Sequence, residues 1–201
     1  MLWIYDEAIA KDLSSAIDTD GGANSCVKVI EPDAIMGLIA QMQEDKIQFP
    51  LVCLTRDSDY NIDTNRTNFT AMKKGVPIGY DSEHNTLYLE KIIPVNLSYT
   101  INILTTNTVD ADEMLKEILF RYTSMYFVTV DIPYEIDNRS IRIGIQVEPD
   151  SIKKTSANLE YITNGALYQT SMQIQCQGAV LISYTPKHME RLYIDDNITI
   201  K

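Results

Sequence analysis

The sequence is poor in the side chains that most often carry catalysis. It has only two histidines, His84 and His188, which stand far apart in polar surroundings. A lone loop histidine is normally solvated, and by itself it indicates neither a base nor a metal ligand. The sequence lacks GxSxG, GxGxxG, phosphate-loop and HExxH motifs, and no cysteine–histidine spacing suggests a nucleophile. We therefore expect a protein that is not an enzyme and needs no cofactor.

Cysteine is also scarce. The three cysteines, Cys26, Cys53 and Cys176, lie far apart in apolar or strand-like runs, and no CxxC pair occurs. The first residues are acidic where a signal peptide needs basic ones, and no apolar run reaches the roughly 18 residues of a membrane span. We expect reduced, buried thiols, a cytosolic setting and no membrane contact.

Positive charge is the third shortage. Lysine and arginine total 17 against 28 aspartates and glutamates, which gives a formal net charge of −11. Phosphate backbones are bound through Lys and Arg, so the chain is a poor general nucleic-acid binder. The longest basic runs are Lys73–Lys74 and Lys153–Lys154, which we interpret as solvated loop charges. Such acidity fits a surface that must not adhere to DNA or to other anions.

The remaining composition is that of an ordinary globular protein. Hydrophobic residues make up 45% of 201 residues, a length that suits one domain. Helices are expected early and mid-chain, and strands late, which indicates an α+β fold with a mixed, largely antiparallel sheet packed against helices. We predict one domain over 1–185 with a long loop at about 57–85, followed by a C-terminal arm over 186–201.

Apolar spacing predicts four elements in the first quarter of the chain. One helix is expected over 4–17, and a second begins at Pro32 and carries an apolar stripe. Strands are expected at 26–30 and at 49–55. The second of these is continuously apolar after its proline, as in a strand covered on both faces.

The best-patterned unit is IPVNLSYTINILTTNTVDADEMLKEILF, residues 93–120. Apolar and polar residues alternate over 95–103, which predicts a strand with one buried face. A helix follows, and Asp110 is predicted to cap it with Glu113 as the partner in a capping box. The unit therefore reads as a strand that leads directly into an amphipathic helix.

This helix is predicted to bury one stripe and to carry an ion pair on its outside. The pair joins Glu117 and Arg121, which are four residues apart. The buried stripe is predicted to comprise Ala111, Met114, Leu115, Ile118, Leu119 and Tyr122.

Four strands are predicted in the second half: 125–132, 139–148, 159–163 and 166–185. Asp137–Asn138 and Asn164–Gly165 are the expected hairpin turns. Pro133 suggests that the first of these strands reaches a sheet edge, and Pro186 is expected to end the last one.

Two carboxylate clusters leave a metal-dependent enzyme as an alternative, because Mg²⁺ and Ca²⁺ prefer oxygen ligands. One cluster is explained by helix capping, and the other lacks the glycine and the terminal glutamate of a calcium loop. The clusters are Asp110, Asp112 and Glu113, and Asp57, Asp59 and Asp63.

The last predicted strand has an unusual polar face. Five successive outward positions are neutral amides or a hydroxyl: Gln169, Ser171, Gln173, Gln175 and Gln177. A solvent face more often carries Lys or Glu, which also guard sheets against unwanted pairing. The face fits a protein–protein contact, a pore-facing surface or a sheet-extending surface, and it also fits a plain solvent face.

The order of these segments resembles the tail-terminator, or tail-completion, proteins of long-tailed bacteriophages and related contractile particles. The resemblance rests on PLVCLTR, on PVNLSYTINILTTNTVDADEMLKEILF, on IGIQVEPDSI and on GALYQTSMQIQCQGAVLISYT, within residues 4–185. It implies a tail-terminator-like fold in a structural virion protein of the tail or neck, present in the host cytoplasm during assembly.

The resemblance also implies the partners. Such proteins form a homo-oligomeric ring, typically a hexamer, that caps the tail tube and joins it to neck or head-completion proteins. In contractile tails they also meet the sheath protein. DNA passes through the ring without sequence-specific binding, which an acidic, lysine-poor lumen permits. Another phage component, such as a neck adaptor, tail-tube or baseplate protein, is the first alternative.

Candidate interface residues come from three places: the long loop, the polar face of the last strand and the C-terminal arm. They are Arg56, Asp57, Tyr60, Arg66, Phe69, Lys73, Lys74, Gln169, Ser171, Gln173, Gln175, Gln177, His188, Arg191 and Tyr193.

Overall fold

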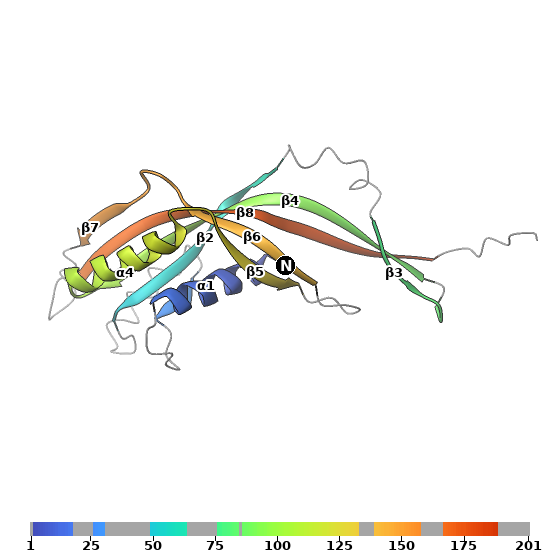
Figure 1. Cartoon of the computed structure of the whole chain (residues 1–201), viewed down its shortest axis with the longest axis horizontal. Coiled ribbons are helices and arrows are strands. Elements are labelled where there is room, and N and C mark those ends of the chain that lie inside the picture. Colours follow the sequence, from blue (N-terminus) through green and yellow to red (C-terminus); the bar gives the residue numbers. More distant parts are fainter. Residues whose placement is uncertain are drawn as a thin grey trace, which may run out of the picture.

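A computed structural model describes residues 2–17, 26–30, 49–63, 76–84, 86–132, 139–157 and 167–188. Within these ranges it has two helices and eight strands, coloured along the chain in Figure 1. The elements are α1 (Trp3–Ile17), β1 (Val27–Val29), β2 (Leu51–Ile62), β3 (Val76–Asp81), β4 (Thr86–Thr105), α4 (Thr108–Tyr122), β5 (Tyr126–Ile132), β6 (Arg139–Val147), β7 (Lys153–Ala157) and β8 (Leu167–His188).

The strands form one mixed sheet with the order β1-β2-β4-β8-β6-β5. β3 pairs with β4 and β7 pairs with β8, beside that main path. Only β1 and β2 pair in parallel among the described strands. The α+β class and the largely antiparallel sheet are therefore confirmed.

Both helices pack on one face of the sheet and contact each other. The alternating side chains of β4 supply the centre of this core, and Leu97, Tyr99 and Ile101 are almost completely buried. α1 adds Ile9 and Leu13, which are fully buried. The helix-side face of the sheet is thus apolar, as the period-two pattern predicted.

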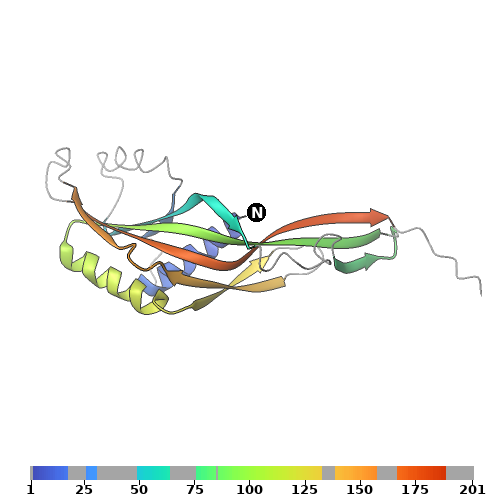
Figure 2. The ribbon, with the colours of Figure 1, turned by 90° about the horizontal axis from the view of Figure 1, so that it is seen from above.

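β4 and β8 are much longer than their neighbours and pair from Thr86↔His188 to Thr105↔Tyr168. Their far ends leave the body as a ribbon, which Figures 1 and 2 show projecting beyond the helices. We call this ribbon the arm and define it as β3, residues 86–94 of β4 and residues 179–188 of β8.

The sheet divides at the root of the arm. β6 pairs with β8 only from Gly144↔Gln177 to Val147↔Ile174, and beyond this point β8 continues into the arm without β6. Gly178, at φ 89°, lies at the register shift between β4 and β8, where an extra residue requires a backbone conformation that glycine adopts freely.

Tyr5 of α1 hydrogen-bonds to the edge of β8 where β6 has ended. Its hydroxyl donates to the carbonyl of Val180 at 2.9 Å and accepts from the amide of Val180 at 2.9 Å. One side chain therefore takes the place of the missing strand at the edge of β8. Tyr5 is fully buried, and burial raises the pKa of its phenol above the usual value.

The predicted loop at 57–85 is partly wrong. β2 continues to Ile62 after a bulge between Arg56 and Tyr60, and β3 forms an antiparallel pair with the start of β4. The Asp- and Asn-rich residues of this stretch favour loops, but the long β4 offers a partner edge, and pairing overrides propensity. Residues 64–75 lie outside the described part of the chain.

The expected end of the last strand at Pro186 is also wrong, because β8 runs to His188. Pro94 and Val180 face each other across β4 and β8, and Pro94 directs its carbonyl away from β8, toward Asp63. Pro94 and Val180 are therefore a pair without hydrogen bonds between them, and Val180 directs its backbone groups away from β4. Every second residue of β8 does the same, so Pro186, six residues after Val180, directs its nitrogen to the free edge of the sheet. A proline there removes no hydrogen bond from the ladder.

Two details of α4 differ from the prediction. Its N-cap is Asn107, whose side chain accepts from the Val109 amide at 3.0 Å, so Asp110 lies inside the first turn and caps nothing. Arg121 pairs with Asp12 of α1 at 2.6 Å, and not with Glu117. The buried stripe is confirmed for Ala111, Leu115, Ile118 and Tyr122, while Met114 and Leu119 are half-buried.

The other element predictions have mixed outcomes. The helix at 4–17 and the strands at 26–30, 125–132 and 139–148 are confirmed to within a residue or two, and β5 is an edge strand as expected. The pair Lys153–Lys154 begins a strand, β7, and is not in a loop. The helix at Pro32, the strand at 159–163, both predicted turns and residues 189–201 fall outside the described ranges.

Candidate functional site

A broad polar surface covers the side of the sheet opposite the helices. β2, β4 and β8 contribute to it, and we call it the amide–acid face. It comprises Thr55, Asp57, Asp59, Asn61, Ser98, Thr100, Asn102, Gln169, Ser171, Gln173 and Gln175.

The register of the strands sets these side chains in rows. Thr55, Thr100 and Gln173 are directly opposite one another across the three strands, and Ser98 faces Gln175 in the next row. Directly opposed residues in antiparallel strands share a face at about 5 Å. The polar positions predicted on β8 therefore continue across β4 to β2.

Asn102 holds the amide part of the face together. Its Oδ1 accepts from Ser171 Oγ at 2.6 Å and from Gln169 Nε2 at 3.1 Å, and Gln169 also lies 3.3 Å from Ser171. Asn102 is buried, at 7% exposure. These three side chains thus hydrogen-bond to one another along the surface.

Carboxylates flank the amides. Asp57 accepts from Thr100 Oγ1 at 3.1 Å, and Glu148 accepts from Gln175 Nε2 at 3.4 Å. Two shallow hollows lie here, of about 520 Å³ over Asp57 and of about 410 Å³ beside Glu148. Among the described residues that line them, Lys153 is the one cation, so the face is negative.

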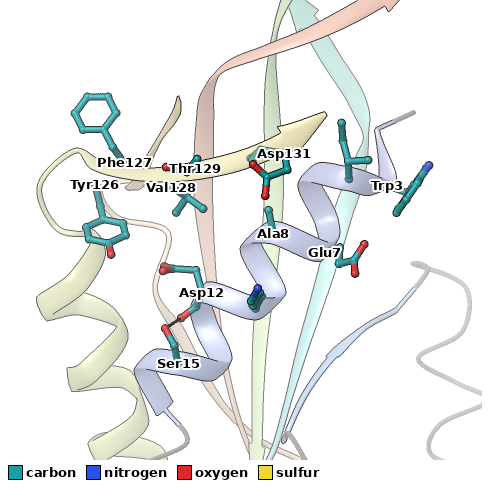
Figure 3. Close-up of a pocket in the computed structure, with 13 residues that line it drawn as sticks. Trp3, Glu7, Ala8, Asp12, Ser15, Tyr126, Phe127, Val128, Thr129 and Asp131 are labelled. Carbon is teal, nitrogen blue, oxygen red and sulfur yellow. Dashed lines mark hydrogen bonds between the residues drawn. The ribbon is translucent and has the colours of Figure 1, made fainter. Parts of the chain in front are cut away.

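A second candidate site is a groove between α1 and the edge strand β5, with a volume of about 660 Å³. Figure 3 shows Trp3 and Glu7 toward one end of α1, with Asp131 of β5 above Ala8. Trp3 is 58% exposed, which is unusual for a side chain of this size. The sequence prediction missed this groove, although an exposed tryptophan outside the apolar stripe of α1 was the available signal.

The deep end of this groove is held by an ionic cluster. Asp12 accepts from Arg121 Nη2 at 2.6 Å and from the hydroxyl of Tyr122, while Arg121 also donates to Tyr126 at 3.1 Å. Burial raises the pKa of Tyr122, and the nearby Asp12 carboxylate raises it further. This cluster fixes α1 to α4 and is a structural feature of the groove.

Arg56, predicted as an interface residue, points to the helix side. Its Nη1 donates to both oxygens of Asp6 at 2.8 and 2.9 Å, and Tyr99 donates to the same carboxylate at 2.8 Å. Burial is the main cause of the raised pKa of Tyr99. Arg56 therefore anchors α1 to the sheet.

The other predicted interface residues lie in several places. Asp57, Gln169, Ser171, Gln173 and Gln175 come together on the amide–acid face, with Gln177 at its margin. Tyr60 is 48% exposed at the root of the arm, and His188 is the last residue of β8. Arg66, Phe69, Lys73, Lys74, Arg191 and Tyr193 lie outside the described ranges.

The described residues give the metal-dependent alternative no geometric support. No group of three or more His, Cys, Asp or Glu side chains among them is close enough to hold a metal ion. Asp112 instead forms an ion pair with Lys154 at 2.5 Å. No described helix is long and apolar enough to cross a membrane.

Comparison with known proteins does not assign the chain to a family: no protein-family model matches it, and no curated protein matches it significantly.

Proposed function

We propose that the chain is the subunit of a tail-terminator-like ring in a phage or phage-like particle. The ring closes the head-proximal end of the tail tube, stops its polymerisation and joins it to the neck. The amide–acid face lines the channel through which DNA passes. This proposal joins the sequence resemblance to one structural observation, the character of that face.

The amide–acid face supports a channel role through its net negative charge, since Lys153 is the one cation among the described residues that line its hollows. DNA adheres to surfaces that replace its counterions with Lys and Arg. Asp57, Asp59 and Glu148 repel phosphates at close range. Between them, Gln169 donates to Asn102, and Gln175 donates to Glu148. A duplex can slide over such a surface without being held.

The long strands support assembly into a ring. A monomer with a projecting arm and open sheet edges leaves apolar surface exposed to water and leaves backbone groups at those edges without strand partners. Repeated head-to-tail contacts between identical copies bury such surfaces, and they close into a ring when the rotation between copies allows it.

Capping of tail tubes tests the function. Tube subunits from the same particle are polymerised with and without the purified protein, and tube lengths are measured by electron microscopy. We expect added protein to stop elongation and to form a ring at one tube end. Incorporation along the whole tube would instead assign the chain to the tube, and unchanged tubes without bound protein would overturn the proposal.

A charge-reversal pair tests the channel face. The variant Asp57→Lys with Asp59→Lys places cations on the face, whereas Glu113→Lys with Glu117→Lys makes the same change of net charge on the exposed side of α4. We expect only the first to retain DNA in a gel-shift assay at low salt. Equal retention by both variants would show that the face does not meet DNA.

A further inference from the structure

The arm carries an apolar face that no described helix covers. Beyond the buried Val95, the helix-side positions of β4 are Ile93, Lys91, Leu89 and Leu87, and all four are at least partly exposed. The face is extended by Tyr60 and Ile62 of β2, opposite Leu97 and Val95, by Tyr80 of β3, opposite Leu87, and by Leu181 of β8, opposite Ile93. We call these residues the arm strip.

The arm strip is more apolar than a solvent face needs to be. Tyr80 is 55% exposed, Ile62 52% and Tyr60 48%, and Lys91 is the one charged side chain of the strip. Contiguous exposed apolar surface of this kind marks an interaction site in a soluble protein.

The edges of the arm are protected, so its face is the surface to be covered. Pro186 directs its nitrogen to the free edge of β8, as argued above. Pro77 of β3 is paired with Leu89 of β4. On β4, Pro94 and every second residue from it direct their backbone N–H and C=O groups toward the β2 and β3 side, and Leu89 is not one of these residues. Pro77 therefore also turns its nitrogen outward. Edge prolines discourage pairing with another strand.

The groove between α1 and β5 is the complementary surface. Its floor is apolar, from Ile4, Ala8, Val128 and Val130. Glu7 and Asp131 are exposed carboxylates along it, whereas the Asp12 carboxylate is engaged with Arg121. An apolar strip with a central lysine is thus complementary to an apolar groove with two exposed acids, although Lys11 also lines the groove.

The area of the arm face fits a small contact that is repeated around a ring. Nine residues of β4 at about 3.3 Å each, and three strands about 4.8 Å apart, give the arm a face of roughly 400 Å². One arm face against one groove therefore buries at most roughly 800 Å² over the two partners, about half of a standard interface.

We propose that the arm of one copy docks, through the arm strip, into the α1–β5 groove of a second copy of this chain, with Lys91 against Glu7 and Asp131. The contact is head-to-tail, because each copy uses one surface on one neighbour and the other surface on the next. The inference rests on the proposed ring, since it names the contact between neighbouring copies.

A charge exchange tests the contact by its effect on assembly. Lys91→Glu, or Glu7→Lys with Asp131→Lys, is expected to weaken self-association at least about tenfold, as measured by analytical ultracentrifugation or native mass spectrometry. A mixture of the two variants pairs the intact arm with the intact groove and the reversed arm with the reversed groove, so it is expected to form mixed rings in which the two variants alternate. The combined variant is expected to restore the ring. Lys116→Glu, an exposed reversal on α4, is the control.

Photo-crosslinking gives a readout that does not depend on ring stability. A photoreactive residue in place of Leu89 is expected to attach to α1 or β5 of another copy. Rings with crosslinks only elsewhere, or rings unaffected by Lys91→Glu, would overturn this contact and leave the ring proposal standing. Crosslinks to a tube or neck protein would assign the arm to that partner. A monomer under all conditions would overturn both proposals.

Discussion

The division of the sheet at the root of the arm predicts a large effect from one hydroxyl. Tyr5→Phe keeps the buried ring and removes only the group that bonds both the amide and the carbonyl of Val180. Each unsatisfied buried polar group costs about 1–3 kcal/mol. Val180 is half-buried, so water can partly replace the hydroxyl and the lower value applies to each group. The expected loss of unfolding free energy is therefore about 2 kcal/mol, or about 4–8 °C in Tm.

Urea denaturation followed by far-UV circular dichroism measures this loss, at a concentration where the wild-type protein is monomeric. Tyr60→Phe is the control, because Tyr60 is 48% exposed, and its variant is expected within about 0.5 kcal/mol of wild type. Hydrogen exchange adds a local readout, since the Val180 amide is expected to lose its protection. A Tyr5→Phe variant within about 0.5 kcal/mol of wild type, with Val180 still protected, would refute the role of Tyr5.

Three further predictions concern the helices and a buried thiol. Asn107→Ala is expected to cost about 1 kcal/mol of unfolding free energy, because the helix loses its N-cap. Asp110→Asn is expected to cost only about 0.3–0.5 kcal/mol, through the helix dipole. A larger loss for Asp110→Asn than for Asn107→Ala would instead identify Asp110 as the cap. Asp12→Asn is expected to cost about 2–3 kcal/mol, because the amide offers one acceptor oxygen to two donors and removes the charge that neutralises Arg121. Glu117→Gln should change stability by less than about 0.5 kcal/mol, and similar losses from the two variants would contradict the cluster. Burial raises the pKa of the Cys53 thiol from 9.0 to about 11. The contribution of this thiol to stability is therefore full below pH 9 and is lost as the pH rises toward 11. Cys53→Ala is expected to flatten the decline of Tm between pH 9 and pH 11, and an unchanged slope would contradict this assignment.

Much of the fold follows from local periodicity. The alternation along β4 and β8 fixed their buried faces, and the 3.6-residue stripes located α1 and the inner side of α4, because these patterns depend only on which side of an element meets the core. The polar side of β8 was predictable for the same reason, and so were its five Gln and Ser positions.

The wrong predictions all concern residues whose structure depends on partners far away in the sequence. Arg121 pairs with Asp12, 109 residues away, and not with the residue four positions earlier on its own helix. The second half of β2 looks like a loop until the long β4 gives it a partner. The end of β8 depends on which edge Pro186 turns to, and that is set by pairing with β4.

The candidate sites divide in the same way. One strand of the amide–acid face was visible in the sequence, but its extension through Asn102 to Asp57 requires the strand register. Trp3, outside the apolar stripe of α1, was a signal for one side of the α1–β5 groove. The groove itself was not predictable, because α1 and β5 are separated by more than a hundred residues and meet only through sheet order.

Electron microscopy of the purified protein, by single-particle averaging, tests the central claim most directly. We predict closed rings with a central channel, the amide–acid face toward that channel and the arm of each copy on its neighbour. Monomeric particles at every concentration, or rings with the helices and not the amide–acid face around the channel, would contradict the account.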